Sequence, residues 1–119
     1  MQKTTYENFA QLDIRVGTIV AAQEFTKAIR PAFKLQIDFG SEIGILKSSA
    51  QITDLYSIES LIGKQVVAVV NFPPKQIANF ISECLILGAV DSQKNVVLLK
   101  TDVQVENGIR ILWGKKSSH

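Results

Sequence analysis

The chain has 119 residues, of which 46% are hydrophobic and 20% are charged, and its formal net charge is +2. This length and composition fit one compact domain with its own hydrophobic core and leave no room for a second domain. The small net charge excludes a histone-like protein that coats nucleic acid through bulk charge, so any nucleic-acid site must be local. We expect a single domain over residues 1–119, with its core at about 8–112.

The first segments predict a short helix followed by a long strand. Thr4 and Glu7 have the spacing of a helix capping box, which would place Tyr6, Phe9 and Ala10 on one face of a helix of one or two turns. Residues 12–22 are rich in β-branched side chains and predict the first strand, which we expect to bend at Gly17.

The middle of the chain predicts a hairpin and a buried strand. Residues 33–39 alternate strictly between apolar and polar side chains, and residues 43–47 return as the hairpin partner after a turn at 40–42. Ser57 and Gly63 are expected to begin and end a short helix. The run at 66–70 is too β-branched for a helix and predicts a strand that is buried on both faces and ends at the polar and proline residues 71–74.

The last third predicts a strand pair and a final turn. Residues 81–90 and 95–100 are expected to pair through the turn-prone segment 91–95, and Asn107-Gly108 marks a turn before the apolar residues near the C-terminus. Short strands with one or two short helices are typical of an all-β, closed or partly open barrel.

Residues that could perform chemistry are few. The single histidine is His119, the last residue, and the single cysteine, Cys84, lies in an apolar run and is expected to be a buried thiol without a disulfide. These residues cannot build a zinc site, and no nucleophile-elbow or phosphate-loop motif occurs. We therefore expect no metal, no cofactor and no catalytic residues. The polar N-terminus and the absence of a long apolar run predict a cytoplasmic protein that does not insert into membranes.

Two windows carry positive charge without acids. Lys27, Arg30 and Lys34 lie between Glu24 and Asp38. Lys64 and Lys75 are the charged residues in a second window further along the chain. Both windows flank predicted strands, where cations could meet phosphates while Phe33 or Phe72 offers a stacking surface. The alternative is a solvated face above core phenylalanines, which the composition alone favours.

Four segments resemble the tRNA-binding domain family and, within it, a branch of chaperones for exported proteins. They are DIRVGTI (13–19), SSAQIT (48–53), GKQVVAVVNFPPKQI (63–77) and SECLILG (82–88). The resemblance implies an oligonucleotide-binding (OB) barrel, a homodimer and tRNA binding. For this branch it also implies chaperone-like binding of unfolded precursor proteins, with the secretion machinery as a further candidate partner. Residues 25–33 depart from the His-Pro-x-Ala-Asp type loop of the synthetase-linked relatives.

The resemblance and the charge pattern together give two sets of candidate site residues. The candidates for tRNA binding are Arg30, Lys34, Lys47, Ser48, Ser49, Gln51, Lys64, Asn71, Lys75, Ser82 and Glu83. The candidates for an apolar peptide groove are Phe33, Phe72, Ile77 and Phe80. Structural roles are open for several of them, because Ser48 and Ser49 could cap a turn, Asn71 could fix a strand end and Glu83 could pair with a lysine.

Two functions remain open, and an enzyme ranks last because no reactive site is assembled. The first is a chaperone-like peptide binder with an apolar groove in a dimer, which the moderate charge slightly favours. The second is a structure-selective tRNA binder whose lysines and arginine contact phosphates. If the two ligands divide the surface, replacing Arg30 or Lys75 should affect only tRNA binding, and replacing Phe72 or Phe80 should affect only peptide binding. A homodimer is expected because apolar residues continue to Trp113.

Overall fold

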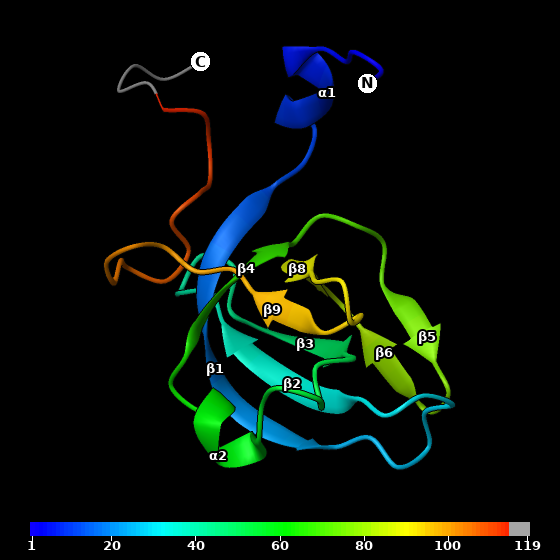
Figure 1. Ribbon diagram of the computed structural model, residues 1–119. Helices are drawn as coiled ribbons and strands as arrows, with labels where there is room; N and C mark the ends of the chain where they lie inside the picture. The colour runs from blue at the N-terminus through cyan, green and yellow to red at the C-terminus, as the bar shows by residue number, and fades with distance from the viewer. Residues whose placement is uncertain (115–119) are drawn as a thin grey trace.

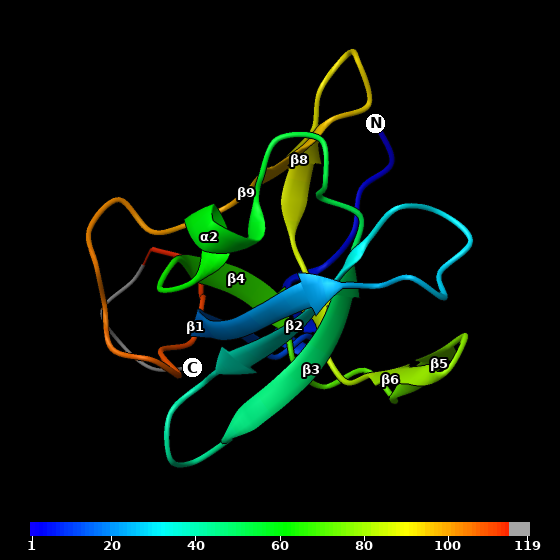
Figure 2. The same ribbon diagram turned by 90° about the horizontal axis from the view of Figure 1, so that it is seen from below.

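The computed structural model describes residues 1–114, which form a small barrel with a short helix standing beside one end (Figure 1). The helices and strands, in chain order, are α1 (Tyr6–Ala10), β1 (Ile14–Glu24), β2 (Phe33–Asp38), β3 (Ile45–Ala50), α2 (Ile58–Leu61), β4 (Gln65–Val69), β5 (Lys75–Ile77), β6 (Phe80–Ser82), β7 (Leu85–Ile86), β8 (Gly88–Val90) and β9 (Val96–Leu98). The view from below shows β1, β2 and β3 curving around one side, with the hairpin of β5 and β6 projecting from it (Figure 2).

One five-stranded antiparallel sheet, in the order β3-β2-β1-β4-β7, makes up the barrel wall. The long strand β1 pairs with β4 through its first half and with β2 through its second half. The wall closes between β3 and the residues before β7, where the amide of Glu83 donates to the carbonyl of Lys47 at 2.7 Å and the hydroxyl of Ser48 donates to the carbonyl of Cys84 at 2.9 Å. The expected OB-type barrel is confirmed.

The core follows the alternation of the sequence. Phe33, Leu35, Ile37 and Phe39 are all buried, as predicted from residues 33–39. The run in β4 is buried on both faces as expected, since Val66 to Val69 are each at most 7% exposed. These strands form the two packed clusters that hold the barrel together.

Gly17 allows close packing of the core against β1. A side-chain carbon at this position would lie 2.7 Å from atoms of both Ile37 and Phe39, so only glycine leaves room for these core side chains. The irregularity of β1 lies further on, where the register with β2 shifts between Ile19 and Ala21. A β-bulge of this kind bends a strand without needing glycine, and the bend expected at Gly17 itself stays a prediction.

Three local predictions need correction. The N-cap of α1 is Thr5, whose side chain accepts from the amide of Asn8, so the predicted box of Thr4 and Glu7 is off by one residue. The segment 81–90 is not one strand but contributes to β6, β7 and β8. The hairpin of β5 and β6 was not predicted, since its turn contains Ala78 at a φ of 53° instead of a glycine.

Other turn and cap predictions are confirmed. Ser57 caps α2, and Gly63 follows its end with a φ of 87°. The carboxylate of Asp91 accepts hydrogen bonds from the amides of Gln93 and Asn95 in the turn between β8 and β9, and these bonds lower the pKa of Asp91. The turn before the C-terminal segment occurs at Asn107-Gly108 as expected.

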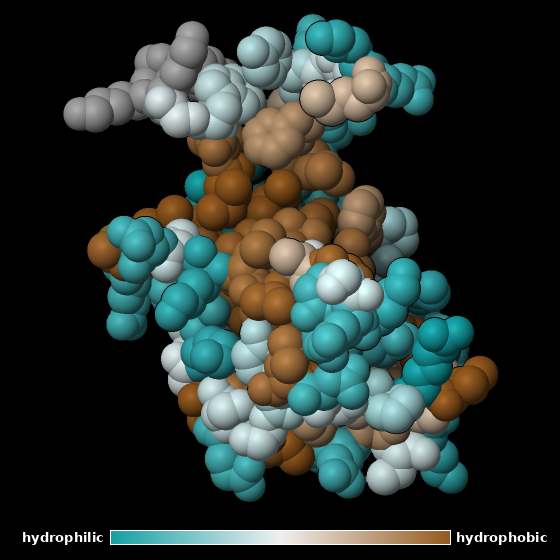
Figure 3. Space-filling view, viewed as in Figure 1, coloured by the Kyte–Doolittle hydropathy of each residue, from teal (hydrophilic) through white to brown (hydrophobic). Residues whose placement is uncertain are grey.

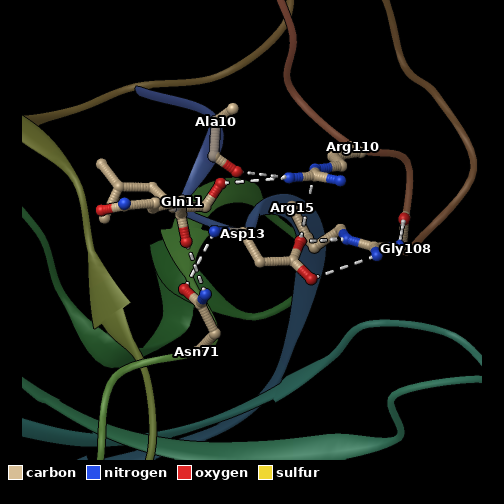
Figure 4. A network of polar contacts seen from close by, with 8 residues as sticks. Ala10, Gln11, Asp13, Arg15, Asn71, Gly108 and Arg110 are labelled. Carbon is tan, nitrogen blue, oxygen red and sulfur yellow. Dashed lines mark hydrogen bonds and ion pairs between the residues drawn. The ribbon is translucent and has the colours of Figure 1, made fainter. Parts of the chain in front are cut away.

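A polar network joins α1, β1 and the C-terminal segment (Figure 4). The carboxylate of Asp13 accepts from Arg15, whose pKa this hydrogen bond raises, and also forms an ion pair with Arg110. Arg110 donates to the carbonyls of Ala10 and Leu12, which anchors the end of α1. The network therefore fixes where both terminal segments leave the barrel.

No helix in residues 1–114 is long and apolar enough to cross a membrane. No group of three or more His, Cys, Asp or Glu side chains within the same residues could hold a metal ion. His119 lies outside the described residues.

Candidate functional site

The outer face of β1, β2 and β3 is polar and carries two of the predicted cations. Lys34 of β2 lies opposite Ser49 of β3, and the neighbouring pair is Gln36 with Lys47. Cross-strand partners share one face of a sheet, and residues two apart along a strand do so as well. All four side chains therefore point away from the core, towards the hairpin of β5 and β6, which contacts β3 through β6.

A cluster of aromatic rings and ammonium groups occupies this face. The rings of Phe25 and Phe80 meet edge to face with their centroids 5.5 Å apart. The ammonium of Lys34 lies 5.5 Å from the centroid of Phe25 and 5.7 Å from that of Phe80, and the ammonium of Lys47 lies 5.5 Å from that of Phe80. These distances are within the range of cation–π attraction, so two positive charges lie within 6 Å of the centroid of the Phe80 ring.

No carboxylate neutralises these two lysines. Within residues 1–114, both ion pairs belong to Asp13, which lies in the network around Arg15. One acid close to the cluster is Glu83, and its Oε1 accepts a hydrogen bond from the backbone amide of Lys47 at 2.9 Å. The ammonium groups of Lys34 and Lys47 are therefore available to an anionic ligand.

Two adjoining hollows flank β3 and β6. The first, here called the Phe80 hollow, has a volume of about 100 Å³ and is lined by Ala21, Ala22, Gln23, Lys34, Leu35, Gln36, Lys47 and Phe80. The second, the Phe72 groove, has a volume of about 280 Å³ and is lined by Ser49, Phe72, Pro73, Lys75, Ile77, Ser82, Glu83, Cys84 and Leu85. The Phe80 hollow offers cations beside an aromatic ring, whereas the Phe72 groove is mainly apolar with Lys75 at its wall.

Four of the predicted site residues have structural roles in the barrel, which their contacts or their burial show. Ser48 is buried and donates to Cys84, and Glu83 accepts from the amide of Lys47 instead of pairing with a lysine ammonium. Asn71 accepts from the amide of Asp13 and donates to the carbonyl of Gln11, so it ties down the strand end. Phe33 is a core residue, 7% exposed, and does not line either hollow. It was wrongly placed in the groove because its strand turns it inward.

The remaining candidates divide by position. Ser82 accepts from the amide of Ser49 at 3.3 Å, and both residues line the Phe72 groove. Arg30 is exposed in the loop between β1 and β2, and Figures 1 and 2 both place that loop on the side where the β5–β6 hairpin lies. Gln51 is exposed just after β3. Lys64 lies apart from the cluster, because it sits over the ring of Tyr56 and lines a different hollow with Lys100.

Phe25 was missed by the sequence analysis. It is buried, at 4% exposure, and supplies the ring on which Phe80 and Lys34 rest. Its position at the start of the acid-free window was a possible signal, but no pattern in that window distinguishes it from a core residue. The cluster joins the loop between β1 and β2 with residues of β2, β3 and β6. A sequence pattern does not reveal such contacts between distant segments.

Cys84 lines the Phe72 groove, and its thiol is expected to be unreactive at neutral pH. Its thiol is buried and lies 3.8 Å from the carbonyl of Lys47. Burial raises the pKa of this thiol to about 12, and the hydrogen bond with Ser48 opposes that shift only in part. The thiol therefore stays protonated at neutral pH and packs as a small apolar group, as expected.

Comparison with known proteins places the whole barrel in a described family. The family "Putative tRNA binding domain" matches residues 14–110. The crystal structure of the chaperone CsaA from Bacillus anthracis str. Ames is 50% identical, with a TM-score of 0.89, and the match covers 93% of this chain and 100% of that one. The CsaA chaperone protein from Picrophilus torridus is 53% identical, with a TM-score of 0.88, over 92% of this chain and 100% of that one.

More distant relatives are much longer proteins. The methionine–tRNA ligase of Methanococcoides burtonii is 35% identical over 104 residues, which are 87% of this chain but 15% of that protein. The corresponding ligase of Methanocaldococcus jannaschii is 32% identical over 93% of this chain and 17% of its own length. The chain thus spans about one sixth of the length of these curated relatives, and the match covers one segment of each ligase.

Proposed function

The chain belongs to the tRNA-binding domain family, and from that membership we propose that it is a non-catalytic protein that binds RNA of the tRNA class on the face of Lys34, Lys47 and Phe80. The observation that carries the proposal is the pair of lysine ammonium groups within 6 Å of the centroid of one half-buried aromatic ring, with no carboxylate of residues 1–114 paired to either. This combination fits a nucleotide, which presents an anionic phosphate and a flat base together.

The geometry suggests how the two parts of a nucleotide would be held. An unpaired base of a tRNA loop would stack on the Phe80 ring, which contributes about 1–3 kcal/mol per base in comparable sites. The ammonium groups of Lys34 and Lys47 would then turn from the ring to neighbouring phosphates, at a small cost because an exposed cation–π contact contributes only about 0.5–1 kcal/mol. Arg30, exposed in the nearby loop, would extend the basic surface along the RNA backbone.

RNA binding is tested by titrating the protein into a fluorescently labelled tRNA transcript and following anisotropy at low salt. We expect saturable binding that weakens steeply as salt increases, because phosphate contacts release counterions. A single-stranded DNA of equal length serves as the control for unspecific charge. Absence of binding at low salt, or equal affinity for both nucleic acids, would contradict a preference for tRNA.

A second function, chaperone-like binding of unfolded or exported precursor proteins, is supported by the Phe72 groove. Phe72 is 46% exposed and Leu85 is 52% exposed, and both line the groove with Pro73 and Ile77. Exposed apolar side chains that gather around a hollow are typical of peptide-binding surfaces. The two similar CsaA structures are of proteins named as chaperones, which agrees with this second proposal.

We also propose that the protein is a cytoplasmic homodimer. α1 contains no buried residue, although Tyr6 and Phe9 both contact the ring of Trp113. Hydrophobic residues gather over β8, β9 and the segment leading towards α1 (Figure 3), and Val90, Val97 and Leu99 are each at least 40% exposed. A second copy would remove this surface from water. Light scattering at micromolar concentration should return twice the chain mass, and a monomer mass would contradict the dimer.

A further inference from the structure

The β5–β6 hairpin presents both kinds of candidate residue on one face. Lys75 lies opposite Ser82, and Ile77 lies opposite Phe80. In an antiparallel ribbon, cross-strand partners point to the same side, and so do residues two apart on one strand. The cation of Lys75 and the apolar side chains of Ile77 and Phe80 therefore share a face, whereas Gln76 and Ile81 form the opposite one.

The Phe80 hollow and the Phe72 groove are lined from the same faces of β3 and β6. On β3, Lys47 lines the first and Ser49, on the same face, lines the second. On β6, Phe80 and Ser82 are divided between them in the same way. The two hollows thus lie next to each other on one surface, and the hydrogen bond of Ser49 with Ser82 lies on the side of the Phe72 groove.

The Phe80 ring is the element that both ligands would need. It closes one side of the Phe80 hollow and already carries the ammonium groups of Lys34 and Lys47. A stacked base would cover this ring, while a bound peptide would place apolar side chains against the same ring and its partner Ile77. A hollow of about 100 Å³ has no room for both groups at once.

We propose that RNA and unfolded peptides compete for this single surface, so that each ligand displaces the other. The inference rests on the proposed RNA and peptide functions and adds a regulation to them. It also replaces the division of the surface that the sequence suggested, in which cations serve one ligand and phenylalanines the other. A protein with this property releases its peptide when RNA is abundant, and it releases RNA when unfolded peptide is abundant.

The test is a competition experiment with the full chain. A fluorescein-labelled, unstructured apolar peptide with no net charge is bound first, so that long-range repulsion by the RNA plays no part. Unlabelled tRNA transcript is then added while anisotropy is recorded. We expect complete displacement of the peptide, with an apparent Kd for peptide that rises in proportion to the tRNA concentration. A plateau at which peptide stays bound with unchanged Kd would show a ternary complex and overturn the inference.

Matched variants on the two faces of the hairpin locate the shared surface. Phe80→Ala should weaken the binding of both tRNA and peptide by about tenfold, the size expected for losing a stacking or anchoring ring. Ile81→Ala, on the opposite face of the same strand, should change neither. Ile77→Ala supplies a second variant if Phe80→Ala loses its cooperative melt. Loss of one ligand alone in both Phe80→Ala and Ile77→Ala would contradict a shared surface.

The outcomes also separate the inference from the functions on which it rests. If the tRNA or the peptide fails to bind when offered alone, the corresponding proposed function is wrong and competition is excluded with it. If both bind alone and both remain bound together, the proposed functions stand and only the inference is wrong. Binding of each alone, with mutual displacement, supports all three statements.

Discussion

Glu83 and Lys47 hold the barrel closed through two reciprocal hydrogen bonds. The amide of Glu83 donates to the carbonyl of Lys47 at 2.7 Å, and the Oε1 of Glu83 accepts from the amide of Lys47 at 2.9 Å. The same lysine places its ammonium over the Phe80 ring. Glu83 and Lys47 thus help to close the barrel, together with the hydrogen bond from Ser48 to Cys84, and Lys47 also supplies one cation of the candidate site.

Replacing Glu83 by alanine should destabilise the protein. The half-buried amide of Lys47 loses its acceptor, and an unsatisfied buried donor typically costs about 1–3 kcal/mol. Glu83→Gln is the matched control, because its side-chain carbonyl can accept the same bond. The free energy of unfolding from urea titrations measures both variants. Equal stability of the alanine and glutamine variants would show that the side-chain bond contributes nothing.

Gly17→Ala should destabilise the core. The added methyl group would lie 2.7 Å from atoms of Ile37 and Phe39, which are both fully buried and have little freedom to move. Overpacking of this kind costs about 1–3 kcal/mol. Gly114→Ala is the control, since nothing lies within 4 Å of its new methyl group. A Gly17→Ala protein that melts at the temperature of the unchanged chain would refute the close packing.

The buried thiol of Cys84 should make stability fall at alkaline pH. Its pKa is about 12 in the folded chain and 9.0 as the reference for an exposed thiol. Below pH 9 the thiol is protonated in the folded and the unfolded state. The free energy of unfolding therefore does not change with pH through this group in that range. Between pH 9 and 12 the unfolded state alone loses the proton, and stability decreases by up to about 1.4 kcal/mol per pH unit.

The comparison with Cys84→Ala separates the contribution of this thiol from every other effect of alkaline pH on stability. The urea midpoint is measured at pH 8 and at pH 10 for both proteins. The decrease from pH 8 to pH 10 should be larger for the unchanged chain than for the variant. A thiol-reactive disulfide reagent at pH 8 should label Cys84 slowly in the native state and rapidly in urea. Rapid labelling of the native protein would contradict the burial of this thiol.

The sequence predicted the elements whose patterns are local. The alternation from Phe33 to Phe39 and the buried run of β4 were correct because a strand's periodicity is written in its own residues. The resemblance to the tRNA-binding domain family and its CsaA branch, drawn from four short segments, is confirmed by the comparisons. The hairpin of β5 and β6 was missed, since a turn at Ala78 carries no glycine signal.

The candidate site was predicted only in part, for a physical reason. Lys34, Lys47 and Phe80 were each named from the sequence, but they were assigned to different ligands. Their meeting at one ring depends on the pairing of β2 with β3 and on the folding of β6 over both, which are long-range contacts. Ser48 was named for tRNA binding but is buried, and Phe33 was named for the peptide groove although the alternation of its own strand already turned it inward.

The most direct test of RNA binding at this face compares two double variants that remove the same charge. Lys34→Gln with Lys47→Gln removes the two ammonium groups at Phe80, and Lys64→Gln with Lys100→Gln removes two that line a separate hollow. The measurement is the slope of log K for tRNA against log salt. The first pair should reduce this slope by about two units and the second should leave it nearly unchanged. The reverse result, or equal slopes for both pairs, would contradict a binding site at Lys34, Lys47 and Phe80.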